Sequence, residues 1–214
     1  FSRKNNFVYE AHSTDYQKSI RLNLENSLKH LGCNIDVLFF HNSADSSLLM
    51  KDPQFFENLL SEYPVKTIGV SVYEPKEVQY LSACLFNLAF QFPCNVLDRR
   101  FNKVKMITGK RYARSVLLQG LLVSKSGLRT NSPNLQIKLL DLQKEYFNKL
   151  ASHKLDPLRL AISYVAQQGF VDYFLIGVDS IKQLESILNI KLYNKHEIIV
   201  IDRLKIKKNK KLID

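Results

Sequence analysis

The chain has 214 residues, of which 45% are hydrophobic and 24% charged, a balance that allows one sizeable core and is too polar for a membrane protein. No apolar stretch approaches the roughly 20 residues that a membrane helix needs, and the first residues lack the pattern of a secretory signal. The three cysteines form no CxxC pair and indicate neither a disulfide framework nor a metal site. We therefore expect a soluble protein of the reducing cytoplasm with no membrane or metal partner.

The net charge of +11 results from 31 basic and 20 acidic residues. Residues 203–214 alone hold six basic residues and one acidic residue, which leaves this segment at +5. We expect it to be a solvated basic tail, with binding to an anionic partner as the alternative. A nucleic-acid binder would depend on this tail alone, so nucleic acid is not the partner we expect.

Apolar strands and amphipathic helices alternate along the chain. The first helix, expected at 14–31, begins with a capping box formed by Thr14 and Gln17 and ends at Gly32. In chain order the further elements are a strand at 35–40, a helix at 53–61, a strand at 65–70, a helix at 75–84, a strand at 88–92, a strand at 115–118, a helix at 134–151, a helix that starts at Pro157 after the cap Asp156 and ends by Gly169, a strand at 173–176, and a helix at 180–188 that begins with Ser180 and Gln183. An initial strand is expected to end near Ser2.

Strands that alternate with helices at this spacing predict an α/β fold built from parallel βαβ units. An open doubly wound sheet and a closed barrel both satisfy this pattern, but no GxGxxG follows any strand, which favours the barrel. The chain supplies about six β/α units, whereas a (β/α)8 TIM barrel has eight. We expect residues 1–202 to form most of such a barrel, with its first two units upstream of Phe1.

Active sites of parallel barrels lie at the carboxyl ends of the strands. The residues expected there, in chain order, are Lys4, His41, Ser71, Gln91, Arg114, Ser115 and Gly177. Of the five histidines, only His41 follows a strand. The alternative for His41 is a structural role, hydrogen-bonded at the end of its strand.

Several segments resemble motifs of the aldo-keto reductase family, in the same order along the chain. SLKHLG at 27–32 and IDVLFFH at 35–41 resemble a helix ending in SLxxLG and the strand ending in the catalytic histidine. IGVS at 68–71 resembles iGvS, and QFPCNVLDRR at 91–100 resembles Q..yN..drr. RSVLLQGLL at 114–122 resembles the loop after the seventh strand, and IGVDS at 176–180 resembles the last cofactor loop. The resemblance covers residues 1 to about 190.

The resemblance implies a barrel that binds NADPH or NADH without a Rossmann domain and transfers hydride to a carbonyl compound, or from an alcohol in reverse. The family uses a tetrad in which a tyrosine protonates the carbonyl oxygen, a lysine paired with an aspartate lowers the pKa of the tyrosine, and a histidine polarises the carbonyl. His41 matches the histidine and Lys4 the lysine, although Lys4 beside Arg3 has a solvated charge as its alternative. The aspartate and the tyrosine would belong to the two units that the chain lacks.

The resemblance also implies a cofactor site. Ser71 and Gln91 match the residues that hold the nicotinamide carboxamide, Arg114 replaces the side chain that stacks on the ring, and Val72 departs from the usual asparagine. The residues matched to the pyrophosphate loop are Ser115, Leu117, Gln119 and Gly120, and those matched to the adenosine-phosphate loop are Gly177, Val178, Asp179, Ser180 and Gln183. Asp179 and Gln183 stand where NADP-preferring members carry basic residues, which favours NAD, with Lys182 acting in the opposite direction. The alternative for 177–183 is an ordinary strand–turn–helix.

Two functions are therefore open. The first is an NAD(P)-dependent oxidoreductase that acts on a small carbonyl compound, and Ser43, Asp45 and Ser46 beside His41 would suit a polar, sugar-like one. The second is a catalytically incomplete barrel of the same descent that serves as a binding or regulatory subunit. Neither alternative fixes the oligomeric state.

Overall fold

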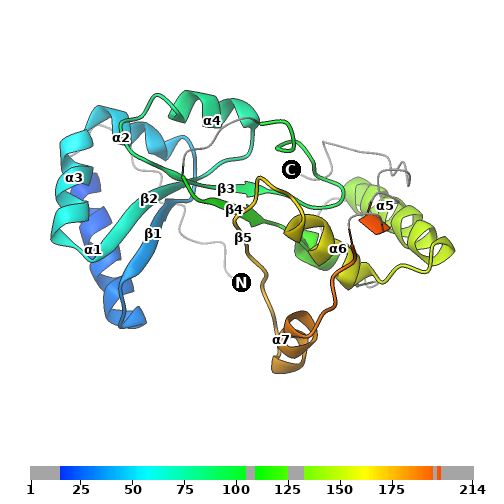
Figure 1. Cartoon of the computed structure of the whole chain (residues 1–214). Helices are drawn as coiled ribbons and strands as arrows, with labels where there is room; N and C mark the ends of the chain where they lie inside the picture. Colours follow the sequence, from blue (N-terminus) through cyan, green and yellow to red (C-terminus); the bar gives the residue numbers. More distant parts are fainter. Residues whose placement is uncertain (1–14, 105–108, 125–132, 195–196, 199–214) are drawn as a thin grey trace.

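The structure, a computed structural model, describes residues 15–104, 109–124, 133–194 and 197–198. Within these residues, five parallel strands form one sheet in the order β1-β2-β3-β4-β5 (Figure 1). The strands are β1 (Ile35–Phe40), β2 (Val65–Ser71), β3 (Ala89–Pro93), β4 (Arg111–Arg114) and β5 (Tyr173–Phe174). The helices are α1 (Asp15–Leu31), α2 (Leu48–Lys51), α3 (Pro53–Glu62), α4 (Pro75–Leu81), α5 (Pro133–Ser152), α6 (Pro157–Ala166) and α7 (Ile181–Leu188), with short 3-10 helices η1 (Asp45–Ser47) and η2 (Leu118–Gly120). The expected parallel α/β architecture is confirmed.

One predicted strand is wrong. The strand expected at 115–118 is β4 instead, four residues earlier, and the chain then turns into η2. Ser115, Leu118 and Gln119 have φ angles of 58°, 46° and 51°, in the left-handed region, which is outside the range of a regular strand.

Other elements differ only at their ends. The helix expected at 75–84 stops at Leu81, where the N–H of Ala83 donates to the carbonyl of Tyr80 in a tight turn. The strand expected at 173–176 is paired only over Tyr173–Phe174. The initial strand near Ser2, the cap at Thr14 and the basic tail at 203–214 lie outside the described residues.

The predicted helix starts rest on side-chain caps. Asp156 accepts a hydrogen bond from the N–H of Arg159 at 2.6 Å, and Pro157 occupies the first turn of α6. Ser180 likewise accepts from the N–H of Gln183 at 3.2 Å and starts α7. These caps explain why both starts could be predicted to within a residue.

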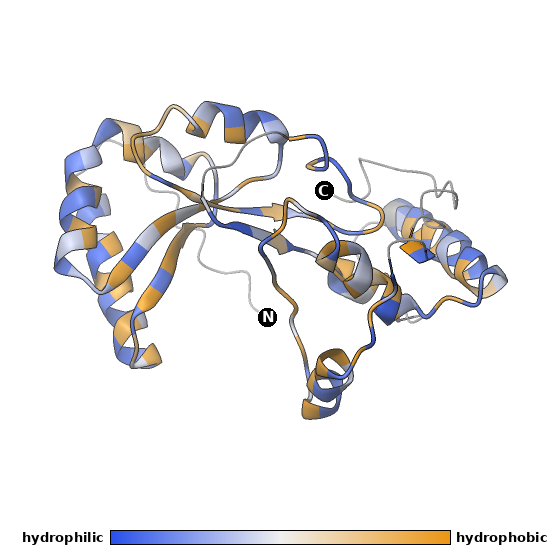
Figure 2. Ribbon diagram, in the orientation of Figure 1, coloured by the Kyte–Doolittle hydropathy of each residue, from blue (hydrophilic) through white to orange (hydrophobic). Residues whose placement is uncertain are grey.

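The two faces of the sheet have different surroundings. Because side chains alternate along a strand, one face carries Ile68, Val70, Phe90, Phe92 and Ala113, all buried. These residues share one core cluster with side chains from α1, α3, α4, α5 and α6. In Figure 2, β1 is drawn largely in the apolar colour, whereas the helices mix both colours, as amphipathic helices do. The opposite face corresponds to the interior of a barrel.

An aromatic row crosses the inner face of the sheet. Phe39 of β1 lies over Gly69 of β2, where a Cβ atom would come within 2.4 Å of the phenyl ring. The same ring makes an edge contact with Tyr112 of β4 at 5.4 Å between centroids, and Tyr112 stacks on Tyr173 at 5.0 Å. The absence of a side chain at Gly69 thus lets β1 contact β4 across two strands.

An ion pair joins β4 to the residue before β5. The guanidinium of Arg111 donates from Nη2 to Oδ1 of Asp172 at 2.7 Å and from Nε to Oδ2 at 2.9 Å. The backbone N–H of Arg111 donates to the same Oδ2 at 2.9 Å. This bidentate geometry fixes the register of the short strand β5.

We expect Asp172→Asn to lower the free energy of unfolding at pH 7 by about 1 kcal/mol, because both side chains are partly exposed and solvent screens the pair. The bond from Arg111 lowers the pKa of Asp172, so its stabilisation is complete above the ordinary aspartate pKa of about 4 and is lost as the pH falls through the lowered value. Urea unfolding at pH 7 and pH 2.5 should show a larger difference at pH 7 than at pH 2.5. Asp36→Asn is the control, because the Asp36–Lys66 pair is highly exposed. An equal loss in both variants would contradict the prediction.

Candidate active site

Strand register brings predicted site residues together on the inner face at the carboxyl edge of the sheet. Ser71 pairs with Gln91, and two residues further along β3, Pro93 pairs with Arg114. Phe40 pairs with Val70, so His41, the next residue, continues the row that contains Ser71. The Ser71 hydroxyl donates to Oε1 of Gln91 at 3.3 Å. Sequence reasoning therefore identified a set of neighbours from four separate strands.

His41 begins the loop after β1. Its side chain is exposed and has no hydrogen-bond partner among the described residues. Lys4, the expected partner in catalysis, lies outside those residues. The imidazole is therefore free to meet a ligand at the edge of the sheet.

The polar residues next to His41 are mostly engaged in protein contacts. Ser46 is fully buried, and its hydroxyl donates to the carbonyl oxygen of Ser43. Ser43 in turn donates to Oε1 of Glu77 at 2.5 Å. Of the three residues expected to suit a polar substrate, only Asp45 has an exposed side chain.

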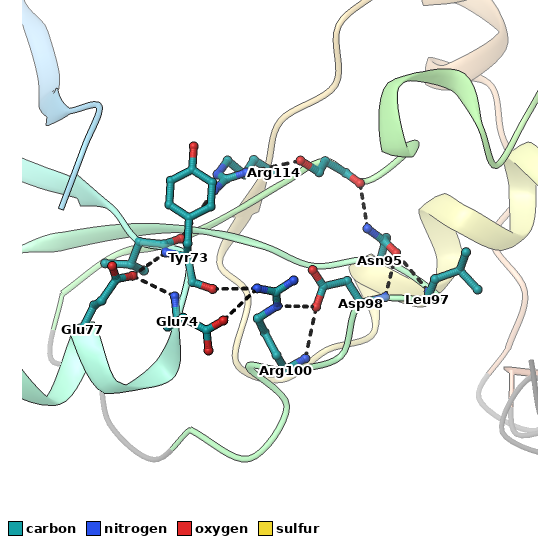
Figure 3. A network of polar contacts seen from close by, with 10 residues as sticks. Tyr73, Glu74, Glu77, Asn95, Leu97, Asp98, Arg100 and Arg114 are labelled. Atoms are coloured by element: carbon teal, nitrogen blue, oxygen red, sulfur yellow. Dashed lines mark hydrogen bonds and ion pairs between the residues drawn. The ribbon is translucent and has the colours of Figure 1, made fainter. Parts of the chain in front are cut away.

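Arg114 ends β4 and lies against an aromatic ring. Its Cζ atom is 4.2 Å from the ring centroid of Tyr73, the second residue after Ser71 (Figure 3). Burial lowers the pKa of Arg114, yet a guanidinium stays protonated in proteins. The longer contacts run from Nη1 to Oγ of Ser115 at 3.4 Å and from Nη2 to the carbonyl of Val72 at 3.5 Å. A positive charge is thus held at the rim by a ring rather than by a carboxylate.

A second arginine, Arg100, forms hydrogen bonds with the loop after β2. Arg100 donates from Nε to Oδ1 of Asp98 at 2.9 Å, and from Nη1 to the carbonyl of Tyr73 at 3.1 Å and to Oε1 of Glu74 at 3.2 Å (Figure 3). Both Arg100 and Asp98 have nearly buried side chains. The network connects the loop after β3 to the loop after β2.

Residues 115–120 form a loop with several positive φ angles, which we call the left-handed loop. Besides the three residues with positive φ noted above, Gly120 has φ of 89°. The fully buried Asn95 donates from Nδ2 to the carbonyl of Ser115 at 3.0 Å and anchors the start of the loop (Figure 3). Left-handed non-glycine residues cost about 1–3 kcal/mol each and concentrate at ligand sites. Such backbone turns also direct N–H groups toward anions.

A cavity of about 1040 Å³ lies between this loop and α7. Its walls come from residues 115–124 and 175–187, with Leu158 between them. The predicted cofactor residues that line it are Ser115, Leu117, Gln119, Gly120, Gly177, Asp179, Ser180 and Gln183. Val178 does not line it and is 38% exposed, and the predicted nicotinamide residues Ser71, Gln91 and Arg114 are not among its lining residues either. Two segments some 60 residues apart in the sequence thus border one open cavity whose volume is sufficient for a dinucleotide.

The N-terminus of α7 forms one wall of this cavity. The backbone N–H of Asp179 donates to Oε1 of Gln183 at 2.7 Å, and Ser180 caps the helix as described. The charged residues that line the cavity are Asp179 and Lys182, one of each sign. The described residues of the lining therefore carry no excess of basic charge.

Sequence reasoning missed two residues of this edge, Tyr73 and Glu77. Tyr73 carries Arg114 on its ring, and Glu77 accepts three hydrogen bonds from two different loops. The only signal in the sequence was their position, two and six residues after Ser71. Within the described residues, no cluster of His, Cys, Asp or Glu could hold a metal ion, and no helix is long and apolar enough to cross a bilayer.

Comparisons with known proteins agree with this architecture. The model of the aldo/keto reductase family matches residues 2–206. No curated protein matches the chain in a sequence search.

Among solved structures, the glycerol dehydrogenase AKR11B4 from Gluconobacter oxydans is similar, with a TM-score of 0.68 and 21% identity over 90% of this chain and 66% of that one. The aldo-keto reductase AKR11C1 from Bacillus halodurans gives a TM-score of 0.66 at 19% identity in its apo form, over 92% of this chain and 72% of that one. Its holo form gives 0.67 at 18%, over 92% and 71%. This chain thus spans just under two thirds of the first structure, and its sheet is part of the predicted (β/α)8 barrel.

Proposed function

The chain belongs to the aldo/keto reductase family, and from that premise we propose that it forms most of a cytoplasmic NAD(P)H-dependent oxidoreductase that reduces a small carbonyl compound or oxidises the corresponding alcohol. The observation that carries the proposal is the cavity between the left-handed loop and α7, which begins at Ser115, the residue after Arg114 at the carboxyl end of β4.

The residues of the cavity suit a dinucleotide. Its volume matches that of a site for a large ligand, and its walls combine backbone groups of 115–120 with the capped N-terminus of α7. Its lining residues are mostly uncharged, so the contacts to phosphates would come from N–H groups and from Ser180 rather than from a basic cluster.

Each residue of the edge then has a defined task. Ser71 and Gln91, already within hydrogen-bond distance of each other, would hold the carboxamide, and Arg114 would lie against the nicotinamide ring. The bound cofactor supplies the hydride. His41 would donate a hydrogen bond to the substrate's carbonyl oxygen as negative charge develops there. The proton donor, a tyrosine assisted by Lys4 and an aspartate, remains part of the proposal.

A polar substrate fits this edge best. The exposed side chains in the loop that begins with His41 include Asp45, and Arg114 places a positive charge at the end of β4, on the same edge of the sheet. The similar structure described as a glycerol dehydrogenase is consistent with a small polyol or sugar-like carbonyl compound. We therefore take glyceraldehyde as the first compound to assay.

The proposal is tested by calorimetric titration of the protein with NADH and NADPH. Binding with a Kd below about 1 mM, followed by oxidation of the cofactor in the presence of glyceraldehyde, supports an oxidoreductase. Binding without turnover of any carbonyl compound would favour the alternative, a regulatory subunit with an intact cofactor site. If neither cofactor binds at millimolar concentration, both versions are rejected.

We expect NADH to bind more tightly than NADPH, because the Asp179 carboxylate at the cavity wall repels a 2′-phosphate. Asp179→Asn should tighten NADPH binding by about 3- to 10-fold and change NADH binding by less than twofold, since one like-charge contact near the surface contributes about 1 kcal/mol. The ratio of the two dissociation constants is the measurement. Asp45→Asn, an exposed carboxylate on another loop, is the matched control. A parallel shift for both cofactors would contradict this role of Asp179.

A further inference from the structure

Glu77, in the first turn of α4, is the junction of two loops at the carboxyl edge of the sheet. Its Oε2 atom accepts the backbone N–H groups of Tyr73 at 2.6 Å and of Glu74 at 2.7 Å. Its other oxygen, Oε1, accepts the hydroxyl of Ser43 at 2.5 Å, from 34 residues earlier in the chain. A single carboxylate therefore satisfies one group from the loop after β1 and two from the loop after β2 (Figure 3 shows the latter two).

The hydrogen bonds around the Glu77 carboxylate stabilise its ionised form. Burial acts to raise the pKa of Glu77, but the bonds from Ser43 and from the N–H groups of Glu74 and Tyr73 outweigh burial and hold the pKa below its ordinary value. An ionised carboxylate accepts on both oxygens at once, which neither a glutamine nor a protonated acid can do equally. The three bonds thus favour the charged form.

The two loops that meet at Glu77 carry different parts of the candidate site. Ser43 is the second residue after His41, and Tyr73 is the second residue after Ser71. Among the described residues, the bond from Ser43 to Glu77 is the one hydrogen bond that joins segment 41–47 to a residue distant in the sequence; its other bonds stay within the segment or reach the adjoining helix. The Tyr73 ring meanwhile supports Arg114.

A purely structural explanation accounts for only one of these three contacts. A glutamate at the third position of a helix commonly accepts the N–H of the cap residue, and Glu77 does so with Glu74. That capping role needs one oxygen and explains neither the bond to Ser43 nor the connection between loops. The Ser43 contact can therefore be removed while the cap is left intact.

We infer that Glu77 is a positioning residue, which sets the distance between His41 on one loop and the Ser71–Tyr73 segment on the other through its bond to Ser43. For catalysis the inference rests on the proposed function, because it states which residue keeps the imidazole in register with the bound nicotinamide. The part of the inference that concerns only the connection between the two loops does not depend on the proposed function. Small misplacements of a reacting group cost far more in turnover than in binding, so the effect belongs in kcat.

The experiment compares four variants of the whole protein: Ser43→Ala, Ser43→Thr, Glu77→Gln and, as a control, Ser82→Ala. Ser82 lies at the end of the same helix, and its exposed hydroxyl donates to the carbonyl of Gln79. Ser43→Ala should lower kcat for glyceraldehyde reduction about 10-fold with the KM for NADH within twofold. Ser43→Thr keeps the hydroxyl and should restore most of kcat. Glu77→Gln should be at least as impaired as Ser43→Ala, and Ser82→Ala should be unchanged.

Hydrogen–deuterium exchange of segment 41–47 provides a readout that needs no activity. We expect the amides of this segment to exchange several-fold faster in Ser43→Ala and Glu77→Gln than in the unaltered protein or in Ser82→Ala. Unchanged exchange in Ser43→Ala, or a Ser43→Thr variant as impaired as Ser43→Ala, overturns the inference. Faster exchange in a protein that binds neither NADH nor NADPH supports the connection between the loops and rejects the proposed function, so the two failures are distinguishable.

Discussion

Replacement of His41 by glutamine is expected to lower kcat for carbonyl reduction by about 100- to 1000-fold. The imidazole stands at the end of β1 in the row of Ser71, exposed and without a partner among the described residues, so a donor aimed at the substrate oxygen is what the variant removes. The loss of one such donor costs about 2.7–4 kcal/mol of transition-state stabilisation in comparable sites. Steady-state kinetics with glyceraldehyde and NADH would measure it.

Two features make this result specific. The dissociation constant for NADH should change by less than about twofold, because the cavity that we assign to the cofactor is lined by 115–124 and 175–187 and not by His41. The matched control is His30→Gln, since His30 lies exposed on α1 with Nδ1 at 2.6 Å from the carbonyl of Asn26. A loss of less than about fivefold in kcat for His41→Gln would leave the imidazole with a structural role only.

Replacement of Gly109 by alanine is expected to lower the free energy of unfolding by more than about 3 kcal/mol. A Cβ atom at Gly109 would lie 1.8 Å from the carbonyl oxygen of Leu88 and 2.6 Å from its carbonyl carbon. Both atoms belong to the backbone just before β3. The residue after Gly109, Lys110, accepts a hydrogen bond from the N–H of Phe90 through its carbonyl oxygen. The clash cannot be relieved by a side-chain rotation, so the pairing of β3 with β4 must open.

Urea unfolding monitored by circular dichroism would measure this loss. Gly169→Ala is the matched control, because no atom lies within 4 Å of a Cβ built there and its φ is not left-handed. That variant should change stability by less than about 0.5 kcal/mol. Equal stability of the two variants would show that the close approach at Gly109 is relieved at no cost.

The elements with a clear local signal were predictable. Asp156 with Pro157 and Ser180 with Gln183 mark helix starts by capping chemistry that needs no tertiary partner. The apolar run at 35–40 likewise predicts its strand, because no polar residue interrupts it after Asp36, although its apolar side chains are half-buried and not buried on both faces. Family resemblance then aligned residues of four strand ends, and the parallel register made Ser71 and Gln91 neighbours.

The parts that failed depend on contacts that are distant in sequence. The apolar letters of 115–118 match a strand, yet the fully buried Asn95 holds the carbonyl of Ser115 and the backbone turns left-handed there. No propensity predicts a positive φ at leucine, because that conformation is unfavourable for the residue itself and survives only when its surroundings impose it. Glu77 was missed for the same reason, since its partner Ser43 is 34 residues away.

The two-sided construction of the cavity links ligand binding to local unfolding. One wall is the loop after β4, and the other begins just after β5, a strand of two residues held to β4 by short pairing and by the Arg111–Asp172 pair. A ligand that contacted both walls would bind only the form in which α7 borders the cavity, and mass action would then suppress the opened form by RT ln(1 + [L]/Kd). We therefore expect a ligand of this cavity to protect the α7 segment from a protease, so that the rate of cleavage there would report occupancy of a site 60 residues earlier in the chain.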